Sequence, residues 1–132
     1  MNPLQIIGVR DAGEPNKERV VIRALEACDT ENYFVGLAIK GQRGRYFPLN
    51  DNFFWFGNGF LRPGDWVFLY TGGGESRVHE VPNQPSRIYT VHWNRPNVLF
   101  ASGEVVPYTG YMDDLDFADE DDPPEVNQRA SA

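Results

Sequence analysis

Residues 60–74 constrain the fold most, because they hold a turn, a strand and a second turn in one short stretch. Pro63 fixes its own φ and Gly64 tolerates a positive φ, so residues 62–65 favour a tight turn. The run 66–70, WVFLY, contains no charged residue and no polar alternation, which favours a strand covered on both faces. Three glycines follow it. We therefore expect strand 66–70 at the centre of the fold, with other strands on both sides.

Aromatic and turn-forming residues indicate that the rest of the chain is also built from short strands. Nine Phe, six Tyr and three Trp are accompanied by thirteen Gly and ten Pro, a usage typical of strands joined by turns. Pro82 and Pro85 argue against a central strand just before residue 87. The remaining patterns predict an all-β, antiparallel β-sandwich, with a short helix over 19–28 as the alternative for one strand. The further strands are expected over 4–9, 19–25, 33–39, 46–49, 87–93, 98–100 and 104–108.

The net charge of −7 is a property of the C-terminal end. Eight acids lie between residues 113 and 125 and Arg129 is the only base after them, whereas residues 1–112 carry eleven acids and eleven bases. So acidic a segment cannot bury enough apolar surface to offset its ordering entropy. We expect a folded domain over 1–112 and a disordered acidic tail over 113–132. A neutral body with an acidic tail makes nucleic acid an unlikely partner on charge alone.

The acidic tail fits two roles. It can keep the protein in solution, or it can dock on a basic surface of a partner protein. In the second role its apolar anchors are Tyr111, Met112, Leu115 and Phe117.

The chain carries no recognisable export or membrane signal. Cys28 is the only cysteine, so no intrachain disulfide can form. Residues 1–7 lack both a basic region and a sufficient apolar run for a signal peptide, and no window approaches the roughly 20 apolar residues of a membrane span. We expect a cytoplasmic protein that is not embedded in a membrane.

Four consecutive aromatic residues, Phe53, Phe54, Trp55 and Phe56, form the first candidate binding segment. Successive side chains of a β-strand point to opposite faces of the sheet, so the four rings cannot all point toward one core. Some must cover a sheet edge, cap the end of the sandwich or form an exposed partner surface. A homo-oligomer assembled through this run or through a free sheet edge is a further possibility.

The only local cluster of bases, Lys40, Arg43 and Arg45, lies in a glycine-containing hairpin turn. Three bases make a modest patch, so a solvated hairpin tip and a nucleic acid contact both fit. The second hypothesis predicts salt-sensitive binding that disappears in Arg43→Glu.

Residues suited to catalysis are few. The chain has two histidines, His79 and His92, without a His-x-x-x-His or Cys-x-x-Cys pattern, and residues 72–74 lack the lysine of a phosphate-binding loop. We expect no metal, no cofactor and no enzymatic activity. A small hydrolase using either histidine, Cys28 paired with a histidine, and an aromatic-lined ligand cavity remain as alternatives.

Five short motifs follow one another in a definite order along the chain. They are 18–22 (ERVVI), 36–39 (GLAI), 45–48 (RYFP), 61–64 (LRPG) with 66–72, and Trp93 with Phe100 and 103–106 (GEVV). Their order resembles that of the lamin tail domain, an immunoglobulin-like β-sandwich. Two positions depart from the family's pattern: Leu37 stands in place of its tryptophan and Glu104 in place of its usual aspartate.

The resemblance implies a non-catalytic module, since lamin tail-like domains serve as interaction domains with protein or nucleic acid partners. No binding residue transfers position by position. We therefore expect a protein-interaction or accessory module of a larger complex, which binds through the aromatic run, the tail or both.

Overall fold

The computed structural model describes residues 2–49, 51–114, 116 and 118. Over these residues the chain forms eleven strands and one 3₁₀ helix, η1 (Gln42–Gly44), so the predicted all-β fold is confirmed. The helical alternative for 19–28 is wrong, because a strand begins at Arg19. Within the described segments, no helix is long and apolar enough to cross a membrane.

The larger sheet has five strands, and β8 lies at its centre between β2 and β10. Its order is β1 (Leu4–Arg10), β2 (Arg19–Ala24), β8 (Trp66–Tyr70), β10 (Arg87–His92) and β9 (Arg77–Glu80). The expectation of purely antiparallel pairing is wrong for one pair, because β10 runs parallel to β8. The reason is β9, which returns the chain along the outer edge so that β10 enters between β9 and β8 in the direction of β8.

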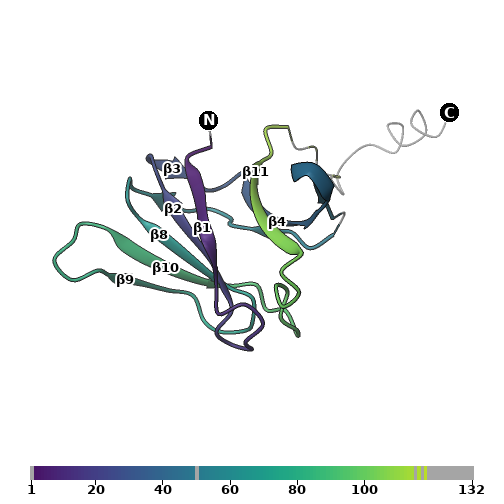
Figure 1. Cartoon of the computed structure of the whole chain (residues 1–132). Coiled ribbons are helices and arrows are strands. Elements are labelled where there is room, and N and C mark those ends of the chain that lie inside the picture. Colours follow the sequence, from purple (N-terminus) through teal and green to yellow (C-terminus); the bar gives the residue numbers. More distant parts are fainter. Residues whose placement is uncertain (1, 50, 115, 117, 119–132) are drawn as a thin grey trace.

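The second sheet is built around β4 (Tyr33–Lys40). Three strands pair with it, all antiparallel: β11 (Val105–Tyr111), β5 (Tyr46–Pro48) and β6 (Phe54–Trp55). A third sheet has only two strands, β3 (Cys28–Asp29) and β7 (Phe60–Leu61). It pairs the connection between β2 and β4 with the connection between β6 and β8. Figure 1 shows the two larger sheets as separate layers, with β1 and β11 next to each other.

Apolar side chains from both sheets meet between the layers and form the core. Along β8, buried residues alternate with half-buried ones. The buried members of the core are Leu4, Val20, Ile22, Ala24, Cys28, Val35, Leu37, Leu61, Val67, Leu69 and Phe100.

The central position predicted for strand 66–70 is confirmed, but the prediction that both of its faces are covered is wrong. Val67 and Leu69 point into the core, whereas Trp66, Phe68 and Tyr70 lie on the opposite face and are half-buried. The second sheet covers only one side of the five-stranded sheet. On the other side, the guanidinium groups of Arg19 and Arg23 lie over the rings of Phe68, Tyr70 and Trp66.

The predicted turn at 62–65 is confirmed, and a buried carboxylate closes it. Gly64 has a φ of 89°, and the backbone N–H of Asp65 donates to the carbonyl of Arg62. The Asp65 carboxylate accepts hydrogen bonds from the backbone N–H groups of Arg62 at 2.8 Å and Arg87 at 2.9 Å. The turn is thereby tied to the start of β10.

The sequence patterns do not predict strand β9. Pro82 and Pro85 lie in the connection after it and not inside it. β9 pairs only with β10 and all four of its residues are exposed, as expected for an edge strand.

The prediction of a strand over 98–100 is wrong, because backbone N–H groups of this segment form hydrogen bonds with a buried carboxylate and not with another strand. The N–H groups of Leu99 and Phe100 donate to Glu18 at 2.8 and 3.0 Å. Glu18 also accepts from the N–H of Gly13 at 2.8 Å and from the hydroxyl of Thr71 at 2.7 Å. This side chain, 1% exposed, joins three connections at one end of the sandwich.

The hydrogen bonds also determine the ionisation of Glu18. Burial raises the pKa of its carboxyl, but the hydrogen bonds from Leu99, Gly13, Thr71 and Phe100 together outweigh burial and lower the pKa below its ordinary value of 4.5. Glu18 is therefore a charged anchor of the fold.

Candidate functional site

The four aromatic residues of the run 53–56 divide between two sides of the second sheet. Phe54 and Phe56 pack against the core, and Phe54 also lies 6.0 Å from the ring of Trp93. Phe53 and Trp55 point outward and are 39% and 44% exposed. The period-two argument is confirmed: only alternate members of the run face inward.

The outward rings gather around Phe34, which sequence reasoning placed only as a strand residue. Its ring centre lies 5.2 Å from that of Phe53, 5.0 Å from that of Trp55 and 6.0 Å from that of Tyr108. Two contacts are edge-to-face and one is tilted, the arrangements aromatic pairs prefer. We call Phe34, Phe53, Trp55 and Tyr108 the aromatic face.

Two glycines allow the rings of the aromatic face to lie flat on the sheet. A Cβ at Gly36 would lie 2.5 Å from the ring of Tyr108, and a Cβ at Gly110 would collide with the ring of Phe34. Each glycine is paired in the β4–β11 ladder with the residue whose ring covers it. The backbone therefore holds these two rings in place before any partner binds.

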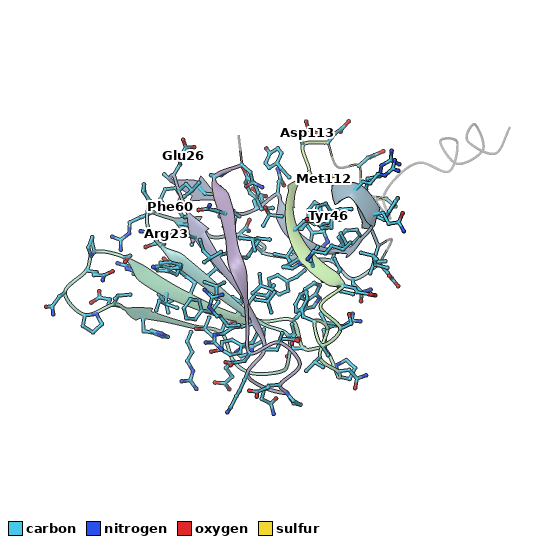
Figure 2. All side chains as sticks on the ribbon, viewed as in Figure 1. Arg23, Glu26, Tyr46, Phe60, Met112 and Asp113 are labelled. Atoms are coloured by element: carbon cyan, nitrogen blue, oxygen red, sulfur yellow. The ribbon has the colours of Figure 1, made fainter. Side chains whose placement is uncertain are left out.

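A shallow apolar groove of about 390 Å³ continues from Tyr108 toward β5. Tyr46, 55% exposed, forms one wall of it, and Figure 2 shows Tyr46 on the side of the molecule occupied by β4 and η1. The groove is lined by Ala38, Tyr46, Pro48, Val106, Pro107 and Tyr108.

The basic turn lies at one end of this groove. Lys40 is the last residue of β4, Arg43 lies in η1, and Arg45 follows η1 directly. Arg43 and Arg45 line an open hollow with Gln42 and Phe47. All three bases are exposed, and none forms an ion pair within the part of the chain that the structure describes. Three positive charges that form no ion pair with another described residue therefore lie next to the groove.

Of the predicted tail anchors, Tyr111 and Met112 are in the described part of the chain. Tyr111 ends β11, packs on Tyr33 with ring centres 4.9 Å apart and is 55% exposed. The N–H of Met112 donates to the carbonyl of Asn32. Leu115, Phe117 and the segment 119–132, with its predicted disorder, lie outside the described residues.

The structure separates the residues considered for catalysis. Cys28 lies in the core, where burial raises the pKa of its thiol and the charge of Asp29 raises it further. His79 and His92 lie on the outer side of the five-stranded sheet, as their register partners Ile88 and Tyr70 show. The sheet therefore lies between the thiol and both imidazoles.

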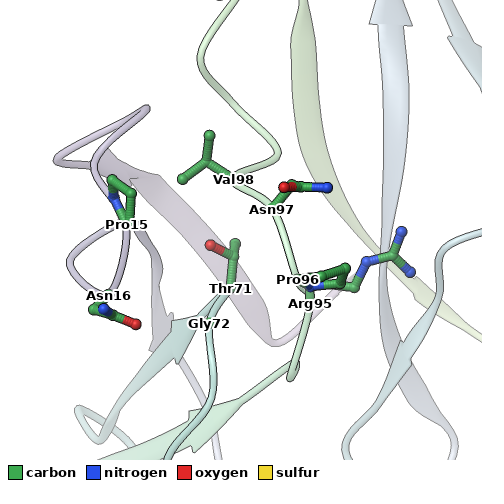
Figure 3. Close-up of a pocket in the computed structure, with 8 residues that line it drawn as sticks. All are labelled: Pro15, Asn16, Thr71, Gly72, Arg95, Pro96, Asn97 and Val98. Carbon is green, nitrogen blue, oxygen red and sulfur yellow. The ribbon is translucent and has the colours of Figure 1, made fainter.

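A small cavity of about 190 Å³ lies among the connections beside Glu18 (Figure 3). Its walls include Pro15, Asn16, Thr71 and Pro96, and the side chain of Arg95 points away from Asn16 and Thr71 in this view. The cavity lining contains no histidine, cysteine or acid. In the described residues, no cluster of three potential metal ligands occurs either. Its one hydroxyl, on Thr71, donates to the buried carboxylate of Glu18 at 2.7 Å, where it helps to join the connections.

Comparisons with protein-family models, with curated proteins and with solved structures give no match for this chain. The assignment of a binding surface therefore depends on the geometry of the chain itself.

Proposed function

We propose that this protein is a non-catalytic interaction module that binds a partner protein through the aromatic face and its adjoining groove. One observation carries the proposal: four aromatic rings are held outward on one sheet by glycines placed beneath two of them. A folded chain normally exposes large apolar side chains singly, and a preorganised cluster of them marks a binding surface. The same proposal includes that the chain is a lamin tail-like domain with an immunoglobulin-like sandwich.

The groove and its border define the chemistry of the partner. The apolar lining suits an extended segment with apolar or proline side chains, which aromatic grooves bind at low entropic cost. Lys40, Arg43 and Arg45 at the border favour carboxylates next to that segment. We therefore propose an acidic, apolar segment of a partner protein as the occupant.

The test is capture from the native host with three versions of the full chain: unchanged, Trp55→Ser and Phe60→Ser. Phe60 is the matched control, because it is an exposed aromatic residue on β7, outside the aromatic face. A central tryptophan contributes about 2 kcal/mol to an interface, so Trp55→Ser should weaken partner binding about thirtyfold.

A partner lost with Trp55→Ser and retained with Phe60→Ser supports the proposal, provided that it cross-links next to residue 55 through an acidic segment. Equal retention by both variants contradicts it. A partner that depends only on residues beyond Met112 would assign docking to the acidic tail.

A further inference from the structure

The outer face of the five-stranded sheet, opposite the core, brings arginine and aromatic residues together. In the ladder between β2 and β8, Arg23 pairs with Trp66 and Arg19 with Tyr70. A register shift in β1 places Arg10 next to Arg19. We call this surface the arginine–aromatic face; its main residues are Arg10, Arg19, Arg23, Trp66, Phe68, Tyr70, Arg77 and His92.

The guanidinium groups lie over the rings. The Cζ atom of Arg23 is 4.8 Å from the ring centre of Trp66. The Cζ atom of Arg19 is 5.9 Å from the ring centre of Phe68 and 5.6 Å from that of Tyr70. These are cation–π distances. Flat guanidinium planes and flat rings therefore cover the middle of this sheet.

The aromatic stack continues onto β10. The imidazole of His92 is stacked on Tyr70, with ring centres 5.4 Å apart and an interplanar angle of 25°. Two nitrogens of the face, Arg19 Nε and His92 Nδ1, are shielded from water and have no hydrogen-bond partner in the described residues. The face thus holds polar nitrogens whose hydrogen-bonding capacity the described fold leaves unused.

Most of the positive charge of this face has no ion-pair partner among the described residues. Arg19 forms an ion pair with Asp11 at 2.8 Å, but Arg10, Arg23 and Arg77 have no ion pair among the residues that the structure describes. Two acids of the domain, Glu18 and Asp65, are buried and engaged in backbone hydrogen bonds. The strand register nevertheless brings Arg10, Arg19, Arg23 and Arg77, which are scattered along the sequence, onto one face of the sheet.

We propose that the arginine–aromatic face binds single-stranded nucleic acid. Phosphates would pair with Arg10, Arg23 and Arg77, and unpaired bases would stack on the rings or on the guanidinium planes over them. Positively charged sheets that carry aromatic side chains bind single strands in this way, because every base has a π face. In a duplex the base faces are stacked on one another, so the aromatic residues of this face would contribute no stacking energy to duplex binding.

The test measures the fluorescence anisotropy of labelled oligothymidine and oligouridine of about 12 nucleotides, with the matched duplex as competitor. The full chain is compared with Arg23→Glu, Arg77→Glu and Arg43→Glu, each checked for folding by thermal unfolding. Arg43→Glu makes the same charge change in the basic turn of the other sheet, so it separates the two surfaces.

We expect single strands to bind in preference to duplex, and each substitution on the face, Arg23→Glu or Arg77→Glu, to weaken binding about tenfold. Arg43→Glu should change affinity less than about twofold. Three phosphate contacts predict that log K falls with log salt concentration at a slope of about −2. The DNA and RNA probes show which sugar the face prefers.

Three results would overturn the proposal. One is equal loss in Arg43→Glu and Arg23→Glu, and another is duplex binding as tight as single-strand binding. The third is no binding even by a full-length variant whose eight acids between residues 113 and 125 are replaced by Asn or Gln. If a peptide of residues 113–125 binds this face and the oligonucleotides do not, the occupant is the chain's own acidic segment.

Discussion

The two outer faces of the sandwich both carry aromatic rings, but they differ in what surrounds those rings. On the second sheet, glycines lie beneath two rings and the adjoining groove is apolar. On the five-stranded sheet, guanidinium groups lie over the rings. Figure 2 places Arg23 and Tyr46 on opposite sides of the molecule. Similar aromatic residues can therefore favour an apolar protein segment on one side and an anionic, base-bearing ligand on the other.

The largest expected effect comes from a residue on which both faces depend. Glu18→Gln replaces one carboxylate oxygen with an amide NH2 group that faces two hydrogen-bond donors, and it removes the charge. Leaving these buried donors without an acceptor should lower the free energy of unfolding by about 3 kcal/mol. Urea unfolding at neutral pH measures this loss. An unchanged midpoint would show that Glu18 does not anchor the connections.

Acid should weaken the same anchor. The pKa of Glu18 is lower in the folded protein than its ordinary value of 4.5. The contribution of its charge to the free energy of unfolding is therefore complete above pH 4.5 and is lost as the pH falls through the folded pKa. The difference in stability between the unchanged protein and Glu18→Gln should therefore shrink below about pH 4.5. Urea unfolding of both proteins across this range checks it, and a constant difference would contradict the role of the charge.

A substitution beneath the rings should damage one face only. Gly36→Ala places a Cβ 2.5 Å from the ring of Tyr108, so the ring must move. Overpacking of this kind should cost about 2 kcal/mol of stability and weaken partner binding, while oligonucleotide binding stays unchanged. Gly73→Ala is the control, because its Cβ would make only a 3.4 Å contact with Asn94. Equal effects of the two substitutions would disprove the role of Gly36.

The smallest effect concerns the guanidinium over Trp66. Arg23→Ala removes an exposed cation–π contact, so stability should fall by about 0.5 kcal/mol, whereas Arg45→Ala should leave it unchanged. A double-mutant cycle with Trp66→Leu, followed by thermal unfolding, isolates the contact. A coupling energy of zero would mean that the guanidinium lies over the ring without stabilising the fold.

Local chemistry explains why parts of the fold could be predicted. Pro63 and Gly64 determine the turn before β8, and the apolar run after it marks the central strand. In the aromatic run, the period of two predicts that only alternate rings face inward. Which pair does so depends on the register between β6 and β4, and no local pattern encodes that register.

Long-range contacts explain what could not be predicted. Glu18 accepts hydrogen bonds from residues 53, 81 and 82 positions away, so its burial is decided by distant connections. The arginine–aromatic face likewise depends on the register of β1, β2, β8 and β10. The bases of this face are scattered along the chain, so sequence reasoning found only the basic cluster that is local.

Fluorine NMR of the 5-fluorotryptophan-labelled protein tests most directly the claim that the two faces take different ligands. Trp55 reports on the aromatic face, Trp66 on the arginine–aromatic face, and Trp93, packed against the core, is the internal reference. Single-stranded oligonucleotide should shift the Trp66 resonance and leave Trp55 in place, whereas the captured partner protein should do the reverse. Movement of Trp55 by the oligonucleotide, or of Trp66 by the partner protein, would contradict the account.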